Sequence, residues 1–146
     1  MSQQVVKFEQ FFAAPRGAVF AYFADHVKFG RIWGGRFTRV QDGQDPLEPN
    51  GLGSVREVRA KGFVFEETIV KFEKPSLIEY RVTKGGPIKN HLGRIEFREV
   101  EGGSKVSYTI TFEPRIPLTG GLMAGLLCAT WHGNVHRAVK EIAAAA

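Results

Sequence analysis

The feature that most constrains the fold is a series of six short segments with β-strand character between residues 36 and 114. Four of the five separators are short and rich in Gly, Pro or Ser, and only the first, residues 43–53, is long. Short turns of this composition join strands that are neighbours and antiparallel. The pattern therefore predicts an antiparallel meander with strands at residues 36–41, 54–60, 63–73, 77–84, 89–100 and 105–114.

The last of these segments shows which kind of sheet to expect. Val106, Tyr108, Ile110 and Phe112 occupy every second position, with polar residues between them. A period of two is typical of a strand with one buried face and one solvated face. We expect the sheet to cover a core on one side only.

The two ends of the chain add helices to this sheet. Residues 5–12 are rich in Val and Phe, and Pro15 suits a first helical position, so we expect a strand followed by helices at residues 16–25 and 29–33. After Pro117 the periodicity is helical up to the alanine-rich end. The sequence predicts a single α+β domain, residues 1–146: a seven-stranded curved antiparallel sheet, two short helices after strand 1, and a long C-terminal helix over the sheet.

The predicted C-terminal helix differs between its two halves. In the first half, Leu122, Met123, Leu126 and Leu127 are spread around the helix axis. Apolar side chains that point away from the sheet must be covered by something other than the sheet. We therefore expect this half of the helix to lie over an apolar, ligand-sized cavity. At 100° per residue, the remaining apolar residues form one stripe that would pack on the sheet: Ala124, Cys128, Trp131, Val135, Ala138, Val139 and Ile142.

Composition limits the classes of partner. The net charge is +5, but Lys and Arg are dispersed among the acids, and no zinc-finger, RRM or KH signature occurs. We therefore expect no nucleic acid partner. Twelve Phe against three Tyr and two Trp supply large apolar surface without polar groups, which favours a large core or a core that encloses something oily.

Targeting signals are not recognisable in the sequence. The first residues lack a basic segment followed by an apolar run, so we expect no export signal. The strongly apolar stretch at residues 116–131 is interrupted by Pro and Gly and is shorter than the roughly 20 residues that span a bilayer. Cys128 is the only cysteine, which excludes an intrachain disulfide. We expect a cytoplasmic protein without a membrane span.

Several short motifs, taken in their order along the chain, carry a resemblance to a known superfamily. They are Phe12-Ala13-Ala14-Pro15 with Val19-Phe20, then Asp25 and Trp33, Gly51-Leu52-Gly53 before a strand with Arg56, Glu66-Glu67 leading to Phe72-Glu73-Lys74-Pro75, Tyr80-Arg81-Val82, and the hairpin Gly103-Ser104-Lys105-Val106-Ser107-Tyr108. In this order the chain resembles the START-like (SRPBCC) superfamily, which includes Bet v 1 and polyketide cyclase/dehydrase-type proteins. The resemblance implies a helix-grip fold. Members range from ligand carriers and hormone receptors to cyclases, and the fold does not choose among them.

Strand parity indicates which side chains face the predicted cavity. If Tyr108 faces the C-terminal helix, matching positions in the adjacent strands place Tyr80 and His91 on the same inner face. With the apolar start of the helix included, the expected ligand-binding residues are Glu66, Thr68, Tyr80, Val82, Ile88, His91, Ile95, Tyr108, Ile110, Phe112, Met123, Leu126, Leu127 and Trp131.

Residues 63–73 are ambiguous because both faces of this strand are partly apolar. Parity alone leaves two inner sets open: Glu66, Thr68 and Val70, or Phe65, Glu67 and Ile69. Comparison with related receptors of the fold favours Glu66 and Thr68 inside.

An inward carboxyl beside an inward His and Tyr has two interpretations. Glu66, His91, Tyr80 and Tyr108 are candidates for general acid–base catalysis, because burial in an oily pocket raises the pKa of a carboxyl group towards neutrality. The interpretation we favour is that these groups orient a polar group of a bound ligand or satisfy one another.

The other histidines do not predict a metal site. His132 and His136 have the i, i+4 spacing of helical zinc ligands, but no Glu follows His132, and both lie on or beside the polar face. His26 has no partner in sequence and is interpreted as a surface or packing residue. Without a phosphate loop, a Rossmann motif or a serine elbow, we expect no cofactor and no metal.

Three functions remain in view. The first is binding of a small hydrophobic molecule, such as a lipid, polyketide, steroid-like or aromatic compound, between the sheet and the C-terminal helix. The second is a cofactor-free cyclase or dehydratase acting in the same cavity. The third is a protein-interaction module or homodimer that uses the apolar start of the last helix.

Overall fold

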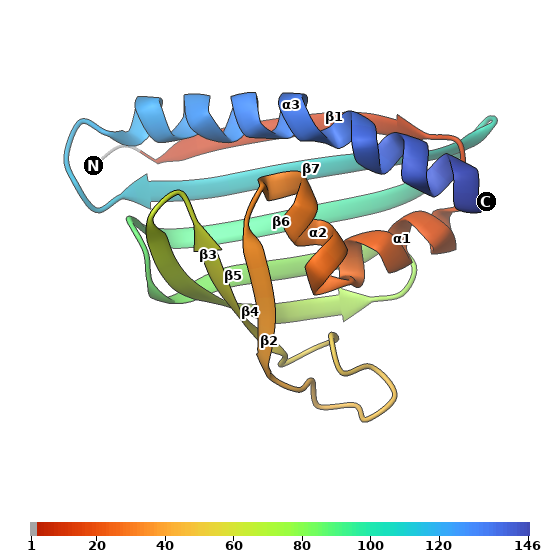
Figure 1. Ribbon diagram of the computed structural model, residues 1–146, viewed down its shortest axis with the longest axis horizontal. Coiled ribbons are helices and arrows are strands. Elements are labelled where there is room, and N and C mark those ends of the chain that lie inside the picture. The colour runs from red at the N-terminus through yellow and green to blue at the C-terminus, as the bar shows by residue number, and fades with distance from the viewer. Residues whose placement is uncertain (1–2) are drawn as a thin grey trace.

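The computed structural model describes residues 3–146 and follows the predicted order of elements (Figure 1). The elements are β1 (Gln4–Phe12), α1 (Arg16–Ala24), α2 (His26–Trp33), β2 (Arg36–Gln41), β3 (Val55–Ala60), β4 (Phe63–Glu73), β5 (Leu77–Gly85), β6 (Ile88–Val100), β7 (Gly103–Pro114) and α3 (Gly120–Ala145).

The seven strands form one antiparallel sheet in the order β1-β7-β6-β5-β4-β3-β2. From β2 to β7 each strand pairs with the next one in sequence, through a long loop between β2 and β3 and through short turns thereafter, and β1 forms the far edge by pairing with β7. The predicted α+β helix-grip fold is confirmed: two short helices connect the edge strands β1 and β2, and the long α3 lies across the sheet (Figure 1).

Local signals explain why α1 and α2 are separate helices. Asp25 has an extended backbone, and its side-chain Oδ1 accepts a hydrogen bond from the Lys28 N–H at 3.0 Å, which caps the start of α2. Gly34 then ends α2 in the left-handed conformation, with φ 66°. The chain turns twice within ten residues and places the Phe29 and Trp33 side chains against the sheet side of the helix pair.

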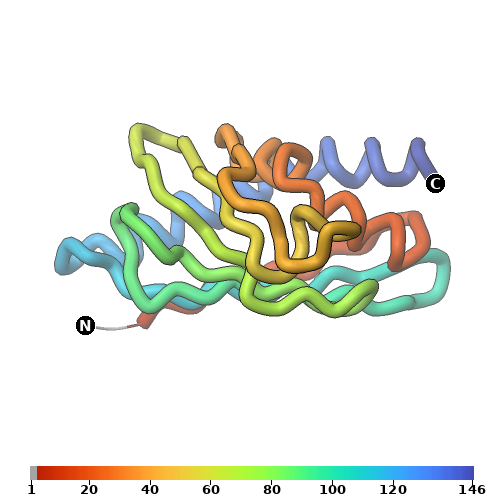
Figure 2. Tube along the Cα trace, turned by 90° about the horizontal axis from the view of Figure 1, so that it is seen from below, coloured from red at the N-terminus to blue at the C-terminus, as the bar shows by residue number. Residues whose placement is uncertain are grey.

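The second half of α3 packs against the core. Trp131, Val135, Ala138 and Ile142 are buried, and the Trp131 ring stacks on Phe8 of β1 with centroids 4.7 Å apart. Helices α1 and α2 lie at this same end of the molecule, beside the C-terminal half of α3 (Figures 1 and 2). We call this region the closed end.

The first half of α3 has a different environment. Leu122 is 77% exposed and Leu126 is 45% exposed, although both belong to a helix that lies over the sheet. Helices α1 and α2 do not extend beside this half, and the turn between β3 and β4 and the turn between β5 and β6 lie at the same end (Figure 1). We call this region the open end. None of the helices within residues 3–146 is long and apolar enough to cross a membrane.

Candidate functional site

A cavity of about 360 Å³ lies at the open end, between the sheet and the first half of α3. This volume falls within the range of roughly 300–1,000 Å³ that is typical of small-molecule sites. Most of the lining side chains are apolar, and six are polar: Lys61, Glu67, Tyr80, His91, Thr119 and Thr130. The cavity therefore offers an oily volume with a small number of polar groups.

Nine of the fourteen side chains expected to bind a ligand line this cavity. They are Tyr80, Val82, Ile88, His91, Ile110, Phe112, Met123, Leu126 and Leu127. The other five do not line it: Glu66, Thr68, Ile95, Tyr108 and Trp131. Of these, Ile95, Tyr108 and Trp131 are buried in the core. Ile95 and Tyr108 lie on the inner face of the sheet that parity indicated, and Trp131 belongs to α3.

The expected orientation of Glu66 and Thr68 is wrong. The residues of β4 that face inward are Phe65, Glu67 and Ile69, and the Thr68 hydroxyl instead pairs with the Thr83 hydroxyl at 2.8 Å on the outer face. The pairing of β4 with β5 shifts register between Ile69 and Lys71. Phe72, which lies beyond this irregularity, also packs on the core. If the strand alternated without interruption from Phe72, Thr68 and Glu66 would face inward. The register shift reverses this, so that they face outward.

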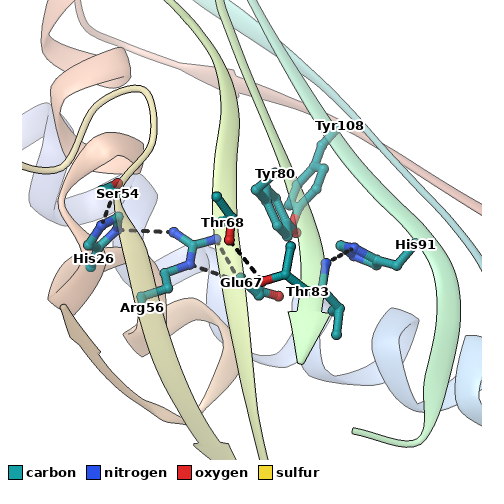
Figure 3. A network of polar contacts seen from close by, with 10 residues as sticks. His26, Ser54, Arg56, Glu67, Thr68, Tyr80, Thr83, His91 and Tyr108 are labelled. Carbon is teal, nitrogen blue, oxygen red and sulfur yellow. Dashed lines mark hydrogen bonds and ion pairs between the residues drawn. The ribbon is translucent and has the colours of Figure 1, made fainter. Parts of the chain in front are cut away.

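The carboxylate that does line the cavity is paired with a buried arginine. Glu67 and Arg56 are directly opposite each other on β4 and β3, and Arg56 is only 2% exposed. The Arg56 Nε donates to Glu67 Oε1 at 2.8 Å, and Nη2 lies at the same distance from that oxygen (Figure 3). No donor within residues 3–146 reaches the second carboxylate oxygen, Oε2.

Three aromatic rings surround the Arg56 guanidinium. Its central carbon lies 4.8 Å from the Phe29 ring centroid, 5.1 Å from that of Phe37 and 4.7 Å from that of Tyr80. Cation–π attraction stabilises a desolvated cation in such a position, and the rings keep water from it. The positive charge is thus enclosed, and Arg56 does not line the cavity, whereas Glu67 does.

The polar network continues from Arg56 towards α2. The Arg56 Nη1 donates to His26 Nδ1 at 3.2 Å, so the proton of the neutral imidazole lies on Nε2, which is 3.4 Å from Ser54 Oγ (Figure 3). Burial, aided by the Arg56 charge, lowers the pKa of His26 to about 3. The interpretation of His26 as a surface or packing residue misses this role, since His26 is a buried acceptor that holds Arg56 in place.

The pKa of Glu67 follows from two opposing effects. Burial raises the pKa of this carboxyl group above its usual value because it disfavours the charged form, and the Arg56 guanidinium offsets part of that rise. Breaking such a buried pair by removing one partner leaves an uncompensated charge.

His91 contributes the opposite kind of group. It is 5% exposed, and its Nδ1 accepts a hydrogen bond from the backbone N–H of Val82 at 3.0 Å. Burial, followed by the charges of Arg56 and Arg81, lowers the pKa of His91 to about 3, so the ring is neutral at physiological pH. Since Nδ1 is an acceptor, Nε2 carries the proton, and no acceptor within residues 3–146 receives it.

Tyr80 on β5 lies between the strands that carry Glu67 and His91, and Gly93 makes room for its ring. The two residues are cross-strand partners, and a Cβ placed on Gly93 would lie 2.2 Å from the Tyr80 ring. The ring therefore rests on the bare backbone of β6, and its hydroxyl makes a short hydrogen bond with the Tyr108 hydroxyl. Burial raises the pKa of both phenols, which keeps them protonated.

The rim of the cavity is apolar and exposed. Ile116, Leu122 and Phe63 line the cavity and are each exposed by more than two fifths of their surface. Across the rim, the turn before β6 is fixed to the loop before α3 by a hydrogen bond from Arg115 N–H to the Pro87 carbonyl at 2.9 Å. A ligand entering between these segments would meet apolar side chains first.

The sequence-based set misses several lining residues from α2, β2 and β3, among them Phe29, Trp33, Phe37 and Val58. The sequence of β3 does contain a signal for its inner face. Arg56, Val58 and Ala60 occupy every second position, so if the Val58 side chain faces inward, the Arg56 side chain faces inward as well. No signal of this kind exists for α2, since the position of a short helix depends on tertiary packing.

The described part of the chain, residues 3–146, contains no cluster of His, Cys, Asp or Glu that could hold a metal ion. His132 and His136 are exposed on α3.

A sequence model of the family described as polyketide cyclase / dehydrase and lipid transport matches residues 3–146. No curated protein matches the sequence significantly.

Solved structures with the same fold cover almost the whole chain. The protein TTHA0849 from Thermus thermophilus superposes with a TM-score of 0.70 at 20% identity, over 97% of this chain and 98% of that one. DR_A0006 from Deinococcus radiodurans gives a TM-score of 0.66 at 17% identity, with 98% and 99% covered. Ara h 8.0201 gives 0.61 at 14% identity, with 92% and 99% covered. At these identities the likeness establishes the fold.

Proposed function

The chain belongs to the polyketide cyclase / dehydrase and lipid transport family, and from this premise we propose that it binds a small hydrophobic molecule in the cavity between the sheet and α3. The observation that carries the proposal is the cavity of about 360 Å³, which is lined mainly by apolar side chains and bounded by an exposed apolar rim. Such a volume at the edge of a well-packed core is unusual, because protein interiors are otherwise filled at crystal-like density. A lipid, polyketide, steroid-like or aromatic compound fits this description.

A neutral apolar fluorophore, N-phenyl-1-naphthylamine, provides the test. Wild-type protein is expected to bind it saturably at one site, and Met123→Trp, which fills the cavity from α3, is expected to weaken binding by at least about tenfold. Lys140→Trp adds the same ring on the exposed face of α3 and serves as the matched control. Absence of saturable binding to the wild type, or equal loss in both variants, would contradict the proposal.

Native mass spectrometry of protein purified from its own host complements this titration. A retained small molecule that Met123→Trp lacks would support ligand binding. A dimer that persists at dilution, without any bound molecule, would instead favour an interaction module built on the exposed start of α3.

A second candidate function is a cofactor-free cyclase or dehydratase. One observation favours it: a carboxylate, Glu67, and a neutral imidazole N–H, from His91, share the wall of an oily cavity, where a base and a hydrogen-bond donor can act on a carbonyl compound. Glu67 replaces Glu66 in this hypothesis, and Tyr80 is the phenol that lines the cavity. Unchanged turnover of a candidate substrate by Glu67→Gln and His91→Phe would remove these roles.

A further inference from the structure

The polar groups of the cavity restrict the chemistry of the ligand beyond its being apolar. Within residues 3–146, two polar side chains of the sheet have an atom without a protein partner: Glu67 has an acceptor, Oε2, and His91 has a donor, Nε2–H. Both side chains line the cavity. The Tyr80 hydroxyl, which also lines the cavity, is already hydrogen-bonded to the Tyr108 hydroxyl.

The two groups flank the same residue of the sheet. Glu67 on β4 is the cross-strand partner of Val82 on β5, and the Val82 backbone N–H holds the His91 ring at 3.0 Å from the other side. Glu67, His91 and Tyr80 are gathered on neighbouring strands β4, β5 and β6 in Figure 3. Val82 therefore has Glu67 on one neighbouring strand and His91 on the other, and both of these side chains line the cavity.

A hydroxyl group satisfies this pair because it is a donor and an acceptor in one atom. Its O–H can donate to the Glu67 carboxylate while its oxygen accepts from His91 Nε2–H. An ether or ketone accepts from His91 but leaves the carboxylate without a donor, and a carboxylate ligand is repelled by Glu67. Arg56 cannot offset that repulsion by contact, because three aromatic rings enclose it and it does not line the cavity.

We propose that the cavity selects uncharged, hydroxyl-bearing apolar molecules, such as phenols, sterol-like alcohols or enols, through the Glu67–His91 pair. This inference rests on the proposed function of the cavity and adds the polar group that its ligand carries.

The test is displacement of bound N-phenyl-1-naphthylamine by three naphthalenes of one shape: 2-naphthol, 2-methoxynaphthalene and 2-naphthoic acid. The hydrogen bond from the hydroxyl to the charged Glu67 carboxylate, which the methoxy compound cannot make, predicts that 2-naphthol binds roughly tenfold to a hundredfold more tightly than the methoxy compound. The acid is expected to be the weakest of the three, and tight binding of the acid that Lys61→Gln leaves unchanged would contradict its repulsion by Glu67.

Variants of Glu67 and His91 separate the two hydrogen bonds of the hydroxyl group. Glu67→Gln keeps an oxygen that accepts from the Arg56 Nε and presents an NH2 donor in place of the acceptor Oε2, so it is expected to bring 2-naphthol and 2-methoxynaphthalene to within about threefold of each other. His91→Phe keeps an aromatic ring but removes the donor that both ligands use, so it is expected to weaken both by a similar factor. His91→Gln keeps an amide donor and an acceptor for the Val82 N–H, and it is expected to restore part of the affinity for both ligands.

The outcomes distinguish this inference from the proposed function. If the fluorophore binds but wild-type protein does not prefer 2-naphthol, if Glu67→Gln keeps the preference, or if His91→Phe leaves the affinity for both ligands unchanged, the hydroxyl inference is overturned and the ligand cavity stands. If the fluorophore does not bind saturably to wild-type protein, both proposals fall.

Discussion

The closed and open ends of this molecule use the same helix in opposite ways. In its second half, α3 buries Trp131, Val135, Ala138 and Ile142 against the sheet and the short helices. In its first half, Leu122 and Leu126 remain partly exposed above a cavity of about 360 Å³. Close packing in the second half supplies stability, and incomplete packing in the first half leaves a cavity, which under the proposed function holds the ligand.

The largest difference between the two ends is expected in the free energy of unfolding when a charge is introduced into each half of α3. Val135→Asp places a carboxylate in the packed core and is expected to lower the free energy of unfolding by about 4 kcal/mol or more. Leu122→Asp, at a site that is 77% exposed, is expected to cost less than about 1 kcal/mol. Urea denaturation followed by circular dichroism measures both, and similar losses would show that the open end is as important for stability as the closed end.

Arg56 lies at the boundary between the two ends, in contact with Phe29 of α2 and paired with Glu67 of the cavity wall. Arg56→Met leaves the Glu67 carboxylate without its partner and is expected to cost about 3–5 kcal/mol in denaturant unfolding. Arg59→Met, which removes an exposed ion pair with Glu57 on the same strand, is the matched control and is expected to cost about 0.5 kcal/mol or less.

The double variant Arg56→Met with Glu67→Leu removes both charges of the buried pair. It is expected to recover most of the stability lost in the single variant, because no unpaired buried charge remains. A double variant as unstable as Arg56→Met alone would assign the loss to packing of the arginine against its three rings.

The two buried histidines predict how stability depends on pH. The pKa of each is lowered from 6.5 to about 3 in the folded protein, so between these values the unfolded chain binds protons that the folded chain does not. Stability therefore decreases as the pH falls below about 6.5, with a slope of about 1.4 kcal/mol per pH unit for each histidine.

His91→Gln tests how much of this pH dependence of stability comes from His91, the histidine at the open end. This variant keeps an acceptor for the Val82 N–H and does not titrate, so the slope between pH 6 and pH 5 is expected to be smaller by about 1.4 kcal/mol per pH unit. Urea midpoints at the two pH values measure the difference, and an unchanged slope would contradict a neutral, buried His91.

The smallest expected effects come from two helical glycines, one in each half of α3. A Cβ on Gly125 or Gly133 would have no heavy atom within 4 Å, so alanine at either site should stabilise the helix by about 0.5–1 kcal/mol. Gly125→Ala is expected, in addition, to slow hydrogen exchange in the first half of α3 only. Destabilisation by Gly133→Ala would show that the closed end does not leave this free space beside Gly133.

The strand pattern could be predicted from the sequence because turns and alternation are local. The alternation of Val106, Tyr108, Ile110 and Phe112 identifies the inner face of β7, and all four of these side chains are buried. The two unlike halves of α3 follow in the same way from helical periodicity.

The orientation of β4 could not be predicted from its own residues. Phe63, Val64 and Val70 are exposed apolar side chains, so neither face is marked as polar, and the register shift after Ile69 arises from pairing with β5.

The buried polar network escaped prediction for a related reason. His26 acquires its partners, Ser54 and Arg56, 28 and 30 residues further along the chain, and Arg56 on its own is typical of a solvated residue. Only the fold brings these groups together.

The central claim, that the open end holds a ligand and the closed end holds the fold together, is tested most directly by Leu126→Asp. Titration with N-phenyl-1-naphthylamine, with denaturation of the same sample, is expected to show at least about tenfold weaker binding and a loss of stability below about 1 kcal/mol. His136→Asp, on the exposed face of the closed end, is expected to change neither quantity. If Leu126→Asp unfolds the protein, or if it binds the fluorophore as tightly as the wild type, the division of α3 into a stabilising half at the closed end and a ligand-binding half at the open end is contradicted.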